Sequence, residues 1–305
     1  MKIAITGGTG FIGSHLARDL ITRGHEVIVI ARGQYTRNTQ LIEGATFVTL
    51  DINETDKLQE VLRGCDALSH CAGTSVEDGK QTFHQLHVEG TRSAATAAER
   101  AGLKKFVLVS YLNVRPNASS AYHTTKWEGE EIVRNSNLNY TILKAGLVYG
   151  AGDHLLNNLS NLFRKMPVFA AVGLKEKTVR LVAVEDLVTV IRESLLDENR
   201  FSRQTVAVTG PEEFPFSQAA RRIAKAMGKP FLIVLPFPVF FHRMLAWFSE
   251  RFMPKPLITK AQVQMLADGI SMPSPESLPL PNDLAPKTLF TEEQIKRGLP
   301  RQKEN

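Results

Sequence analysis

Residues 2–13 read KIAITGGTGFIG, and this stretch decides the fold. The apolar run Lys2–Thr6 predicts a buried strand, and glycines follow it directly. Next, Phe11–Arg23 carries apolar residues at helical spacing and stops at Gly24, a residue type that closes helices in the left-handed conformation. The β-branched run Glu26–Ala31 predicts a second strand. A strand, a glycine-rich loop, a helix and a strand in this order predict a βαβ unit with parallel strands.

The glycines of this loop lie at the spacing that binds a dinucleotide. Gly7 permits the tight turn, Gly10 lets a pyrophosphate approach the backbone, and Gly13 lets the helix pack close to the strand. The free N–H groups at the start of the helix then face the phosphates. The residues expected to bind the cofactor here are Thr6, Gly7, Gly10, Phe11, Ile12 and Gly13. The alternative is a glycine-rich turn without a ligand.

The same alternation continues through the first half of the chain. Further strands are expected at Thr46–Leu50, Ala67–Cys71, Lys105–Ser110 and Tyr140–Lys144. Helices are expected at Thr55–Leu62, Gln81–Ala101 and Tyr122–Asn135. Strands that alternate with helices predict the α/β class, here a doubly wound parallel sheet of the Rossmann type.

The second half has weaker signals. We expect residues 1–150 to form the dinucleotide-binding domain. Residues 175–210 are expected to return to it, with a strand at Thr178–Val182, a helix at Val184–Asp197 and a strand at Gln204–Thr209. Residues 151–174 and 211–290 are expected to form a smaller, mostly helical substrate domain, with helices at Leu155–Lys165, Phe216–Met227 and Thr259–Leu266. Prolines in Met272–Pro286 predict an extended strap, and residues 291–305 predict a final helix, Thr291–Arg297, and a tail.

The end of the second strand bears on the choice between NAD and NADP. An acidic residue there would bind the ribose hydroxyls of NAD, but Arg32 follows this strand, with Arg37 close behind. A guanidinium suits a 2′-phosphate, so NADP is preferred over NAD; the alternative is that Arg32 is a solvated loop residue. Asp51, after the third strand, is a candidate acceptor for the adenine amino group or, equally, a loop cap.

Together with Tyr122-His123-Thr124-Thr125-Lys126, the glycine spacing resembles the short-chain dehydrogenase/reductase superfamily, in its extended and atypical branches of NAD-dependent epimerase/dehydratase type. Four further stretches extend the resemblance over the first half of the chain: His70–Gly73, Val88–Thr91, Phe106–Ser110 and Ile142–Gly150. The resemblance implies that Ala72 and Gly73 lie beside the adenine side of the cofactor and that Lys126 reaches the nicotinamide ribose. The second half most resembles the atypical branch that includes the dehydrogenase-like accessory subunit of respiratory complex I.

Tyr122 and Lys126 are the candidate catalytic pair. Residues four apart share a helix face, and the ammonium of Lys126 is expected to lower the pKa of Tyr122 from about 10. Tyr122 then becomes a proton donor or acceptor near neutral pH. The alternative is an exposed helix with an unrelated tyrosine and lysine, but the position between the fifth and sixth strands favours a site.

Two positions depart from the pattern that the resemblance implies. Ser110, the third candidate catalytic residue, occupies the first hydroxyl position, but Tyr111 follows where the extended families carry a substrate-orienting Ser or Thr. Either Ser110, Ser119 or Ser120 supplies this hydroxyl, or none is present. His87 stands where many extended members have Asn, and we interpret it as a packed histidine rather than a catalyst.

Composition excludes several classes of protein. The 305-residue chain has 37 Lys and Arg against 31 Asp and Glu, and its net charge of +6 favours anionic partners such as nucleotides, phosphates or acidic lipid. Without a run of five basic residues or a zinc-finger spacing, neither nucleic acid nor a metal is expected. Cys65 and Cys71 are too few for a disulfide framework and predict a reducing, cytoplasmic setting, at most peripheral to a membrane. No signal-peptide core follows Met1, the expected start of the mature protein, and the longest apolar stretch, Phe231–Phe241, is too short to span a bilayer.

The aromatic-rich segment Phe237–Met253 has two interpretations. It forms either an amphipathic surface for a membrane or a greasy substrate, or the core of the second domain, which we favour. The sequence as a whole predicts an oxidoreductase that passes a hydride between NAD(P) and a carbonyl or alcohol carbon of a small, apolar, quinone-like or isoprenoid substrate. The alternatives are a cofactor-binding structural, assembly or redox-sensing protein within a complex, and a nucleotide-sugar epimerase or dehydratase.

Overall fold

The structure, a computed structural model, describes residues 1–33, 42–77, 81–118, 120–253 and 258–300. Arg37 and Ser119 lie outside the described residues. The chain divides into two units by its internal contacts. Unit 1 comprises Met1–Ala145, Leu187–Ala207 and Ser274–Leu284, and unit 2 comprises Gly146–Asp186, Val208–Pro273 and Ala285–Asn305.

Unit 1 is built on an eight-stranded sheet with the strand order β14-β11-β6-β5-β4-β1-β2-β3. In chain order the strands are β1 (Lys2–Thr6), β2 (Glu26–Ala31), β3 (Ala45–Thr49), β4 (Ala67–His70), β5 (Lys105–Tyr111), β6 (Tyr140–Ala145), β11 (Gln204–Val208) and β14 (Leu278–Pro279). All pairs from β3 to β6 are parallel, as is the pair of β11 and β14. Every residue of β4, β5 and β6 is buried, because helices cover both faces of a parallel sheet. The doubly wound α/β fold expected from the sequence is confirmed.

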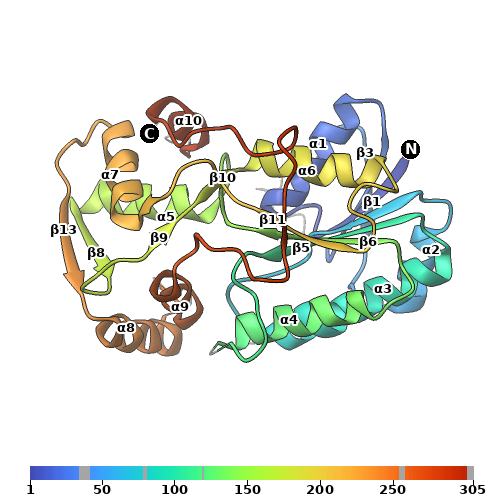
Figure 1. The fold of residues 1–305 in the computed structure, drawn as a ribbon, viewed down its shortest axis with the longest axis horizontal. Coiled ribbons are helices and arrows are strands. Elements are labelled where there is room, and N and C mark those ends of the chain that lie inside the picture. Colours follow the sequence, from blue (N-terminus) through green and yellow to red (C-terminus); the bar gives the residue numbers. More distant parts are fainter. Residues whose placement is uncertain (34–41, 78–80, 119, 254–257, 301–305) are drawn as a thin grey trace. The chain divides into compact units, whose positions relative to one another are not determined.

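Helices flank the sheet of unit 1 on both sides (Figure 1). They are α1 (Phe11–Thr22), α2 (Thr55–Leu62), the π-helical η1 (His84–Glu89), α3 (Gly90–Ala101), α4 (Ala121–Arg134) and α6 (Val184–Leu196), which begins in unit 2. The single helix expected at Gln81–Ala101 begins instead at His84, and its first part is the widened turn η1. This turn meets α4 closely, since a Cβ on Gly129 would lie 2.4 Å from the carbonyl oxygen of His87.

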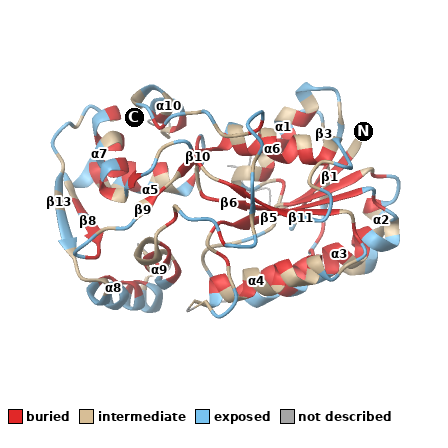
Figure 2. Ribbon diagram, viewed as in Figure 1, coloured by how far each residue is buried: buried red, intermediate tan, exposed pale blue. Residues whose placement is uncertain are grey.

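Unit 2 contains shorter elements. Its strands pair as β7 (Leu147–Tyr149) with β10 (Leu181–Ala183), β8 (Val168–Val172) with β13 (Ile233–Phe237), and β9 (Thr178–Val179) with β12 (Phe214–Pro215). Its helices are α5 (His154–Lys165), α7 (Phe216–Ala226), α8 (Val239–Phe252), α9 (Lys260–Asp268) and α10 (Glu292–Gly298). In Figure 2, buried residues fill the central strands of unit 1, whereas its edge strands β3 and β14 have none, and α8 and β13 are mostly exposed.

Two segments differ from the expectation. Leu278–Pro279, placed in the strap by the sequence, forms the edge strand β14 beside β11, where the missing N–H of a proline needs no partner. Thr178–Val182 does not return to the large sheet. Its residues contribute instead to β9 and β10, whose partners β12 and β7 belong to unit 2.

Candidate functional site

The glycine loop joins β1 to α1 and packs against the segment that follows β4. Gly7 has a φ of +66°, and a Cβ built there would lie 2.7 Å from the Cα of Ala72. A Cβ on Gly13 would lie 2.5 Å from the carbonyl oxygen of Gly7. Side chains essentially never approach backbone atoms this closely, so these two contacts require glycine. Thr6, the buried last residue of β1, joins its hydroxyl to Nδ1 of His70 at 2.7 Å.

The start of α1 is free to receive an anion. Gly10 is the N-cap residue, and among the described residues no side chain caps this end of the helix. A Cβ on Gly10 would meet the carbonyl oxygen of Gly7 at 3.1 Å and otherwise open space in the described part of the chain. Phe11 and Ile12 begin the helix, whose first N–H groups have no acceptor within the helix. Since these groups and the helix dipole favour negative charge, the arrangement fits the pyrophosphate of a dinucleotide.

Arg32 and Asp51 are exposed residues just beyond β2 and β3. Arg32 Nη2 donates to Oε1 of Gln81 at 2.7 Å. Asp51 Oδ1 accepts hydrogen bonds from the backbone N–H and the side-chain amide of Asn53, both at 2.9 Å. Asp51 therefore caps its own loop, which was one of the two roles left open by the sequence.

Helix α4 carries Tyr122 and Lys126 one turn apart. It begins after Ser120, whose hydroxyl accepts a hydrogen bond from the backbone of the first turn, so Ser120 acts as the helix cap. Lys126 Nζ donates to the carbonyl oxygen of Val109 at 3.2 Å. A Cβ on Gly73 would lie 3.3 Å from the same Nζ. The ammonium group thus lies between β5 and the segment that follows β4.

Aromatic rings surround Tyr122. Four rings lie with their centroids 5.4 to 5.9 Å from the centroid of the Tyr122 ring. They belong to Phe83, His87, Tyr111 and His123. Burial raises the pKa of Tyr122, and it lowers the pKa of Lys126 to about 8 against the opposing charge of Glu130. The expected lowering of the Tyr122 pKa by Lys126 is therefore wrong for this structure, because the phenol loses its surrounding water on burial.

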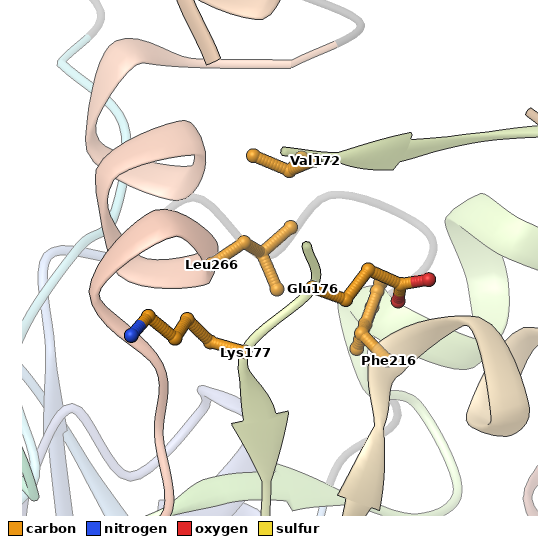
Figure 3. A pocket seen from close by; sticks show the side chains of 5 residues that line it. All are labelled: Val172, Glu176, Lys177, Phe216 and Leu266. Atoms are coloured by element: carbon orange, nitrogen blue, oxygen red, sulfur yellow. The ribbon is translucent and has the colours of Figure 1, made fainter. Parts of the chain in front are cut away.

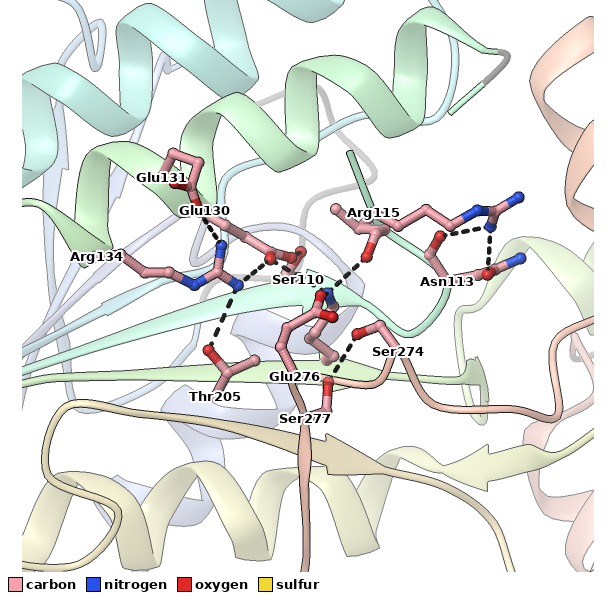
Figure 4. A network of polar contacts seen from close by, with 12 residues as sticks. Ser110, Asn113, Arg115, Glu130, Glu131, Arg134, Thr205, Ser274, Glu276 and Ser277 are labelled. Atoms are coloured by element: carbon pink, nitrogen blue, oxygen red, sulfur yellow. Dashed lines mark hydrogen bonds and ion pairs between the residues drawn. The ribbon is translucent and has the colours of Figure 1, made fainter. Parts of the chain in front are cut away.

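Ser110 lies in a buried network of charges (Figure 4). Its Oγ donates to Oε1 of Glu130 at 2.5 Å. The second oxygen of that carboxylate lies 2.6 Å from Arg134 Nη2 and 3.3 Å from Lys144 Nζ. Lys144 also forms an ion pair with Glu276 at 3.0 Å. The Ser110 hydroxyl therefore satisfies a buried carboxylate, in a network that joins β5, α4, β6 and the segment before β14.

The sequence-based predictions did not include this network of Ser110, Glu130, Arg134, Lys144 and Glu276. Lys144 is the one charged residue of the fully buried strand β6, and a buried ammonium requires a carboxylate, so the lysine itself was the available signal.

His87 is packed, as expected from the sequence. It stacks on Phe83 and accepts a hydrogen bond from the backbone N–H of Thr74 at 3.3 Å. Burial and the charge of Lys126 lower the pKa of His87 to about 2, so its ring is neutral.

Unit 2 holds a small pocket lined by Val172, Glu176, Lys177, Phe216 and Leu266 (Figure 3). Its volume of ≈ 10 Å³ admits a single water-sized group, which is too little for a substrate. In the described part of the chain, no three His, Cys, Asp or Glu side chains lie together as metal ligands would. No described helix combines the length and the apolar character needed to cross a membrane.

The parallel sheet, the glycine loop and the Tyr-Lys helix define a class, the short-chain dehydrogenase/reductases with a dinucleotide-binding α/β fold. Within it, the chain belongs to the NAD dependent epimerase/dehydratase family, whose model matches residues 3–204. This match confirms the family resemblance noted in the sequence.

Similar proteins differ in activity and setting. Ceramide reductase of Caulobacter vibrioides is 31% identical over 77% of this chain and 74% of its own length. Subunit 9 of the NADH dehydrogenase (ubiquinone) 1 alpha subcomplex, a mitochondrial protein of Mus musculus, is 27% identical over 92% of this chain and 74% of its own. The structure of UDP-glucuronic acid 4-epimerase from Bacillus cereus in complex with NAD aligns with a TM-score of 0.71 over 97% of both chains, at 19% identity. This last likeness shows the shared fold.

Proposed function

We propose that the protein is an NAD(P)-dependent oxidoreductase acting on a carbonyl or alcohol carbon, with Tyr122 as the acid/base. The proposal rests on one observation: the glycine loop and the Tyr-Lys helix meet at the same segment after β4. Gly7 packs against Ala72, and the ammonium of Lys126 lies beside Gly73. Pyrophosphate binding at the start of α1 and a ribose contact from Lys126 are thus compatible with a single dinucleotide.

The nicotinamide, when bound, supplies or accepts the hydride. Tyr122 moves the proton at the substrate oxygen. Its raised pKa keeps the phenol protonated at neutral pH, so the site is poised to donate a proton, as the reduction of a carbonyl requires. Lys126, with a pKa of about 8, is largely charged at neutral pH and holds the cofactor ribose. Because Ser110 is bonded to Glu130, we assign it to positioning α4 rather than to contact with the substrate.

The substrate we propose is apolar. The aromatic rings around Tyr122 offer little to a sugar hydroxyl and favour an apolar body next to the reacting carbonyl. A relative named ceramide reductase is in keeping with a lipid-like molecule. The compounds to be screened as substrates therefore form a panel of long-chain lipid carbonyls, quinones and short ketones.

The test is turnover of NADPH and NADH against this panel, with Tyr122→Phe beside the wild type. Loss of the phenol should lower kcat by about 10²–10⁴-fold and leave nucleotide affinity unchanged. The matched control is Tyr149→Phe, which removes a hydroxyl that donates to the Leu289 carbonyl in unit 2 and should retain activity. Equal turnover in Tyr122→Phe and wild type would remove Tyr122 from the reaction.

We further propose a preference for NADP over NAD through Arg32. This guanidinium is exposed at the end of β2, bonded to the neutral amide of Gln81, and among the described residues no carboxylate pairs with it. In a fluorescence titration, Arg32→Asp should lose NADPH affinity at least tenfold, whereas Arg63→Asp, the same charge change at the exposed end of α2, should not. Equal or tighter binding of NADH by the wild type would discard this preference. A tightly retained NAD would favour the epimerase or dehydratase alternative.

A nucleotide-binding protein without turnover is the second candidate function. The observation that favours it is the Ser110 hydroxyl, which is held by Glu130, together with Tyr111 at the position where a second hydroxyl was expected. Tight nucleotide binding, no reaction across the panel and co-purification with a membrane complex would establish it. Turnover by the isolated protein would exclude it.

A further inference from the structure

Helix α8 in unit 2 presents its apolar side outward. The residues that it buries are small or polar: His242, Ala246 and Ser249. The large apolar residues of α8 that are more than half exposed are Phe240, Met244, Trp247, Phe248 and Phe252, which we call the aromatic face. The sequence interpretation of this segment as a domain core is therefore wrong for these five residues, because the helix turns its smaller side inward.

The exposed apolar surface continues onto β13. Ile233, Leu235 and Phe237 occupy every second position of this strand and so share one face, and Ile233 and Leu235 are 40% and 43% exposed. The ring of Phe237 stacks on that of Phe241 in α8, with 5.2 Å between centroids. Strand and helix thus share one apolar surface, which is unusual for a protein without a partner, since monomers rarely expose large contiguous apolar patches.

The inward side of α8 packs Ala246 into a small apolar cluster with Val172 and Val263, but it also buries a histidine. His242 is 3% exposed, and neither of its ring nitrogens has a hydrogen-bond partner among the described residues. Burying such a ring without a hydrogen bond costs free energy, and leaving Phe and Met side chains in water forgoes the free energy that their burial would supply. The orientation is therefore costly on both sides of the helix unless something covers the aromatic face.

The charge distribution indicates what covers it. Unit 2 contains 18 Lys and Arg against 11 Asp and Glu, whereas unit 1 contains 19 against 20, so the cationic excess of the chain resides in unit 2. Arg243 and Arg251 are exposed on α8 itself, and Arg251 lies 5.8 Å from the ring of Phe252. Trp and Phe together with Arg are the residues that settle at the boundary between lipid headgroups and acyl chains.

We propose that α8 and β13 form a docking surface for an anionic phospholipid bilayer. The aromatic face enters the headgroup region with the helix parallel to the membrane plane, and the basic residues of unit 2 attract the acidic headgroups. This inference is independent of the proposed chemistry, because it uses residues of unit 2 alone.

The first test is sedimentation of the full chain with vesicles of phosphatidylcholine, alone or mixed with phosphatidylglycerol. We expect binding to the mixed vesicles that is at least tenfold tighter than to phosphatidylcholine and that weakens as salt rises. Phe240→Ser combined with Phe248→Ser should lower this binding at least tenfold. The matched control is Leu278→Ser with Leu289→Ser, which removes two side chains of similar exposure outside the surface and should bind as the wild type does.

The second test uses the fluorescence of Trp247. The chain has two tryptophans, so Trp127→Phe leaves Trp247 as the sole reporter. Its emission should shift to shorter wavelength when phosphatidylglycerol vesicles are added. Circular dichroism and thermal unfolding show that each variant remains folded. The proposal is overturned if the folded wild type does not bind the vesicles. It is also overturned if the wild type is an oligomer that binds no vesicles and that the Phe240 and Phe248 substitutions dissociate, since the surface would then join two copies of the chain.

Discussion

At the scale of single residues, the site is governed by the cost of burying charge. Lys126 holds its ammonium on one backbone carbonyl oxygen, beside Gly73, in surroundings that lower its pKa to about 8. Glu130, one turn further along α4, is fully buried but shares its oxygens among Ser110, Arg134 and Lys144. The same helix therefore carries one weakly compensated charge, suited to a ligand, and one fully compensated charge, suited to structure.

We expect kcat/KM for carbonyl reduction to fall as pH rises through about 8, where Lys126 loses its proton. The direction follows from burial, which lowers the pKa of Lys126 below that of an exposed lysine, so the charge is lost earlier on the alkaline side. Lys126→Arg keeps its charge to much higher pH and should show no such decline, although its turnover is lower. The measurement is kcat/KM as a function of pH for the wild type and for Lys126→Arg. If kcat/KM declined in parallel in both proteins, the titrating group would be one other than Lys126.

Gly13→Ala should weaken nucleotide binding at least tenfold and destabilise the fold by about 1–3 kcal/mol. The added Cβ would lie 2.5 Å from the Gly7 carbonyl oxygen, so α1 must move away from the loop. Gly24→Ala, just beyond the other end of α1, is the control, because its φ of +80° makes alanine strained while no atom lies within 4 Å among those described. It should lower stability without changing affinity. Urea unfolding and NADPH titration separate the two effects.

Residue types and spacing were enough to place the glycines in the loop between β1 and α1 and to place Tyr122 and Lys126 one turn apart on a helix. They were not enough for Ser110, because its partner Glu130 lies on another element and their contact depends on how α4 crosses β5. The pKa of Tyr122 was misjudged for the same reason. Sequence places Lys126 one turn away, but the rings that exclude water come from separate parts of the chain, such as Phe83 and Tyr111.

At the scale of elements, β14 shows how one ion pair can place a weak strand. Its two residues, Leu278–Pro279, are exposed and have little intrinsic tendency to pair. Just before them, Glu276 reaches the fully buried Lys144 of β6 at 3.0 Å. Prolines correctly predicted an extended segment here, but no local pattern could show which edge it would join, since that depends on a lysine more than a hundred positions earlier.

Glu276→Gln should loosen this segment. Lys144 keeps its second carboxylate, Glu130, and the Glu276 side chain is 35% exposed, so we expect a loss of about 1 kcal/mol rather than the 3–5 kcal/mol of a fully buried pair. Hydrogen exchange in residues 274–284 should quicken. Asp283→Asn, which breaks the more exposed pair with Arg200 in the same segment, should change stability by less than about 0.5 kcal/mol.

The stabilising effect of Glu276 should also depend on pH. Burial raises its pKa, but hydrogen bonds from its own backbone and from Lys144 outweigh this and leave the pKa lowered from 4.5. Its contribution is therefore present above pH 4.5 and is lost as pH falls through the lower value of the folded state. Unfolding curves of wild type and Glu276→Gln should converge in acid, and a constant difference between them at all pH values would contradict the ion pair.

At the scale of the whole molecule, the two units differ in what they bury and what charge they carry. Unit 1 buries central strands of four to seven residues and is nearly neutral, and the family match covers most of it. Its fold was predictable because strand and helix periodicities are strong there. Unit 2 pairs strands of two to five residues that carry little apolar signal, and it exposes the aromatic side of α8 that was assigned to a core. An amphipathic pattern gives the two faces of a helix but not which of them turns inward.

Two different ligands should therefore protect two different sets of residues. NADPH at a concentration about 100 times its Kd should slow hydrogen exchange in the glycine loop and at the start of α1. The slowing should be about a hundredfold for amides that exchange only after the nucleotide is released. Phosphatidylglycerol vesicles should instead slow exchange in α8 and β13. Gly13→Ala should abolish the first protection and keep the second, and the paired Phe240→Ser and Phe248→Ser substitutions should do the reverse. If one variant abolished both protections, the two surfaces would be parts of a single site, because a substitution in one of two independent sites affects the binding of one ligand alone.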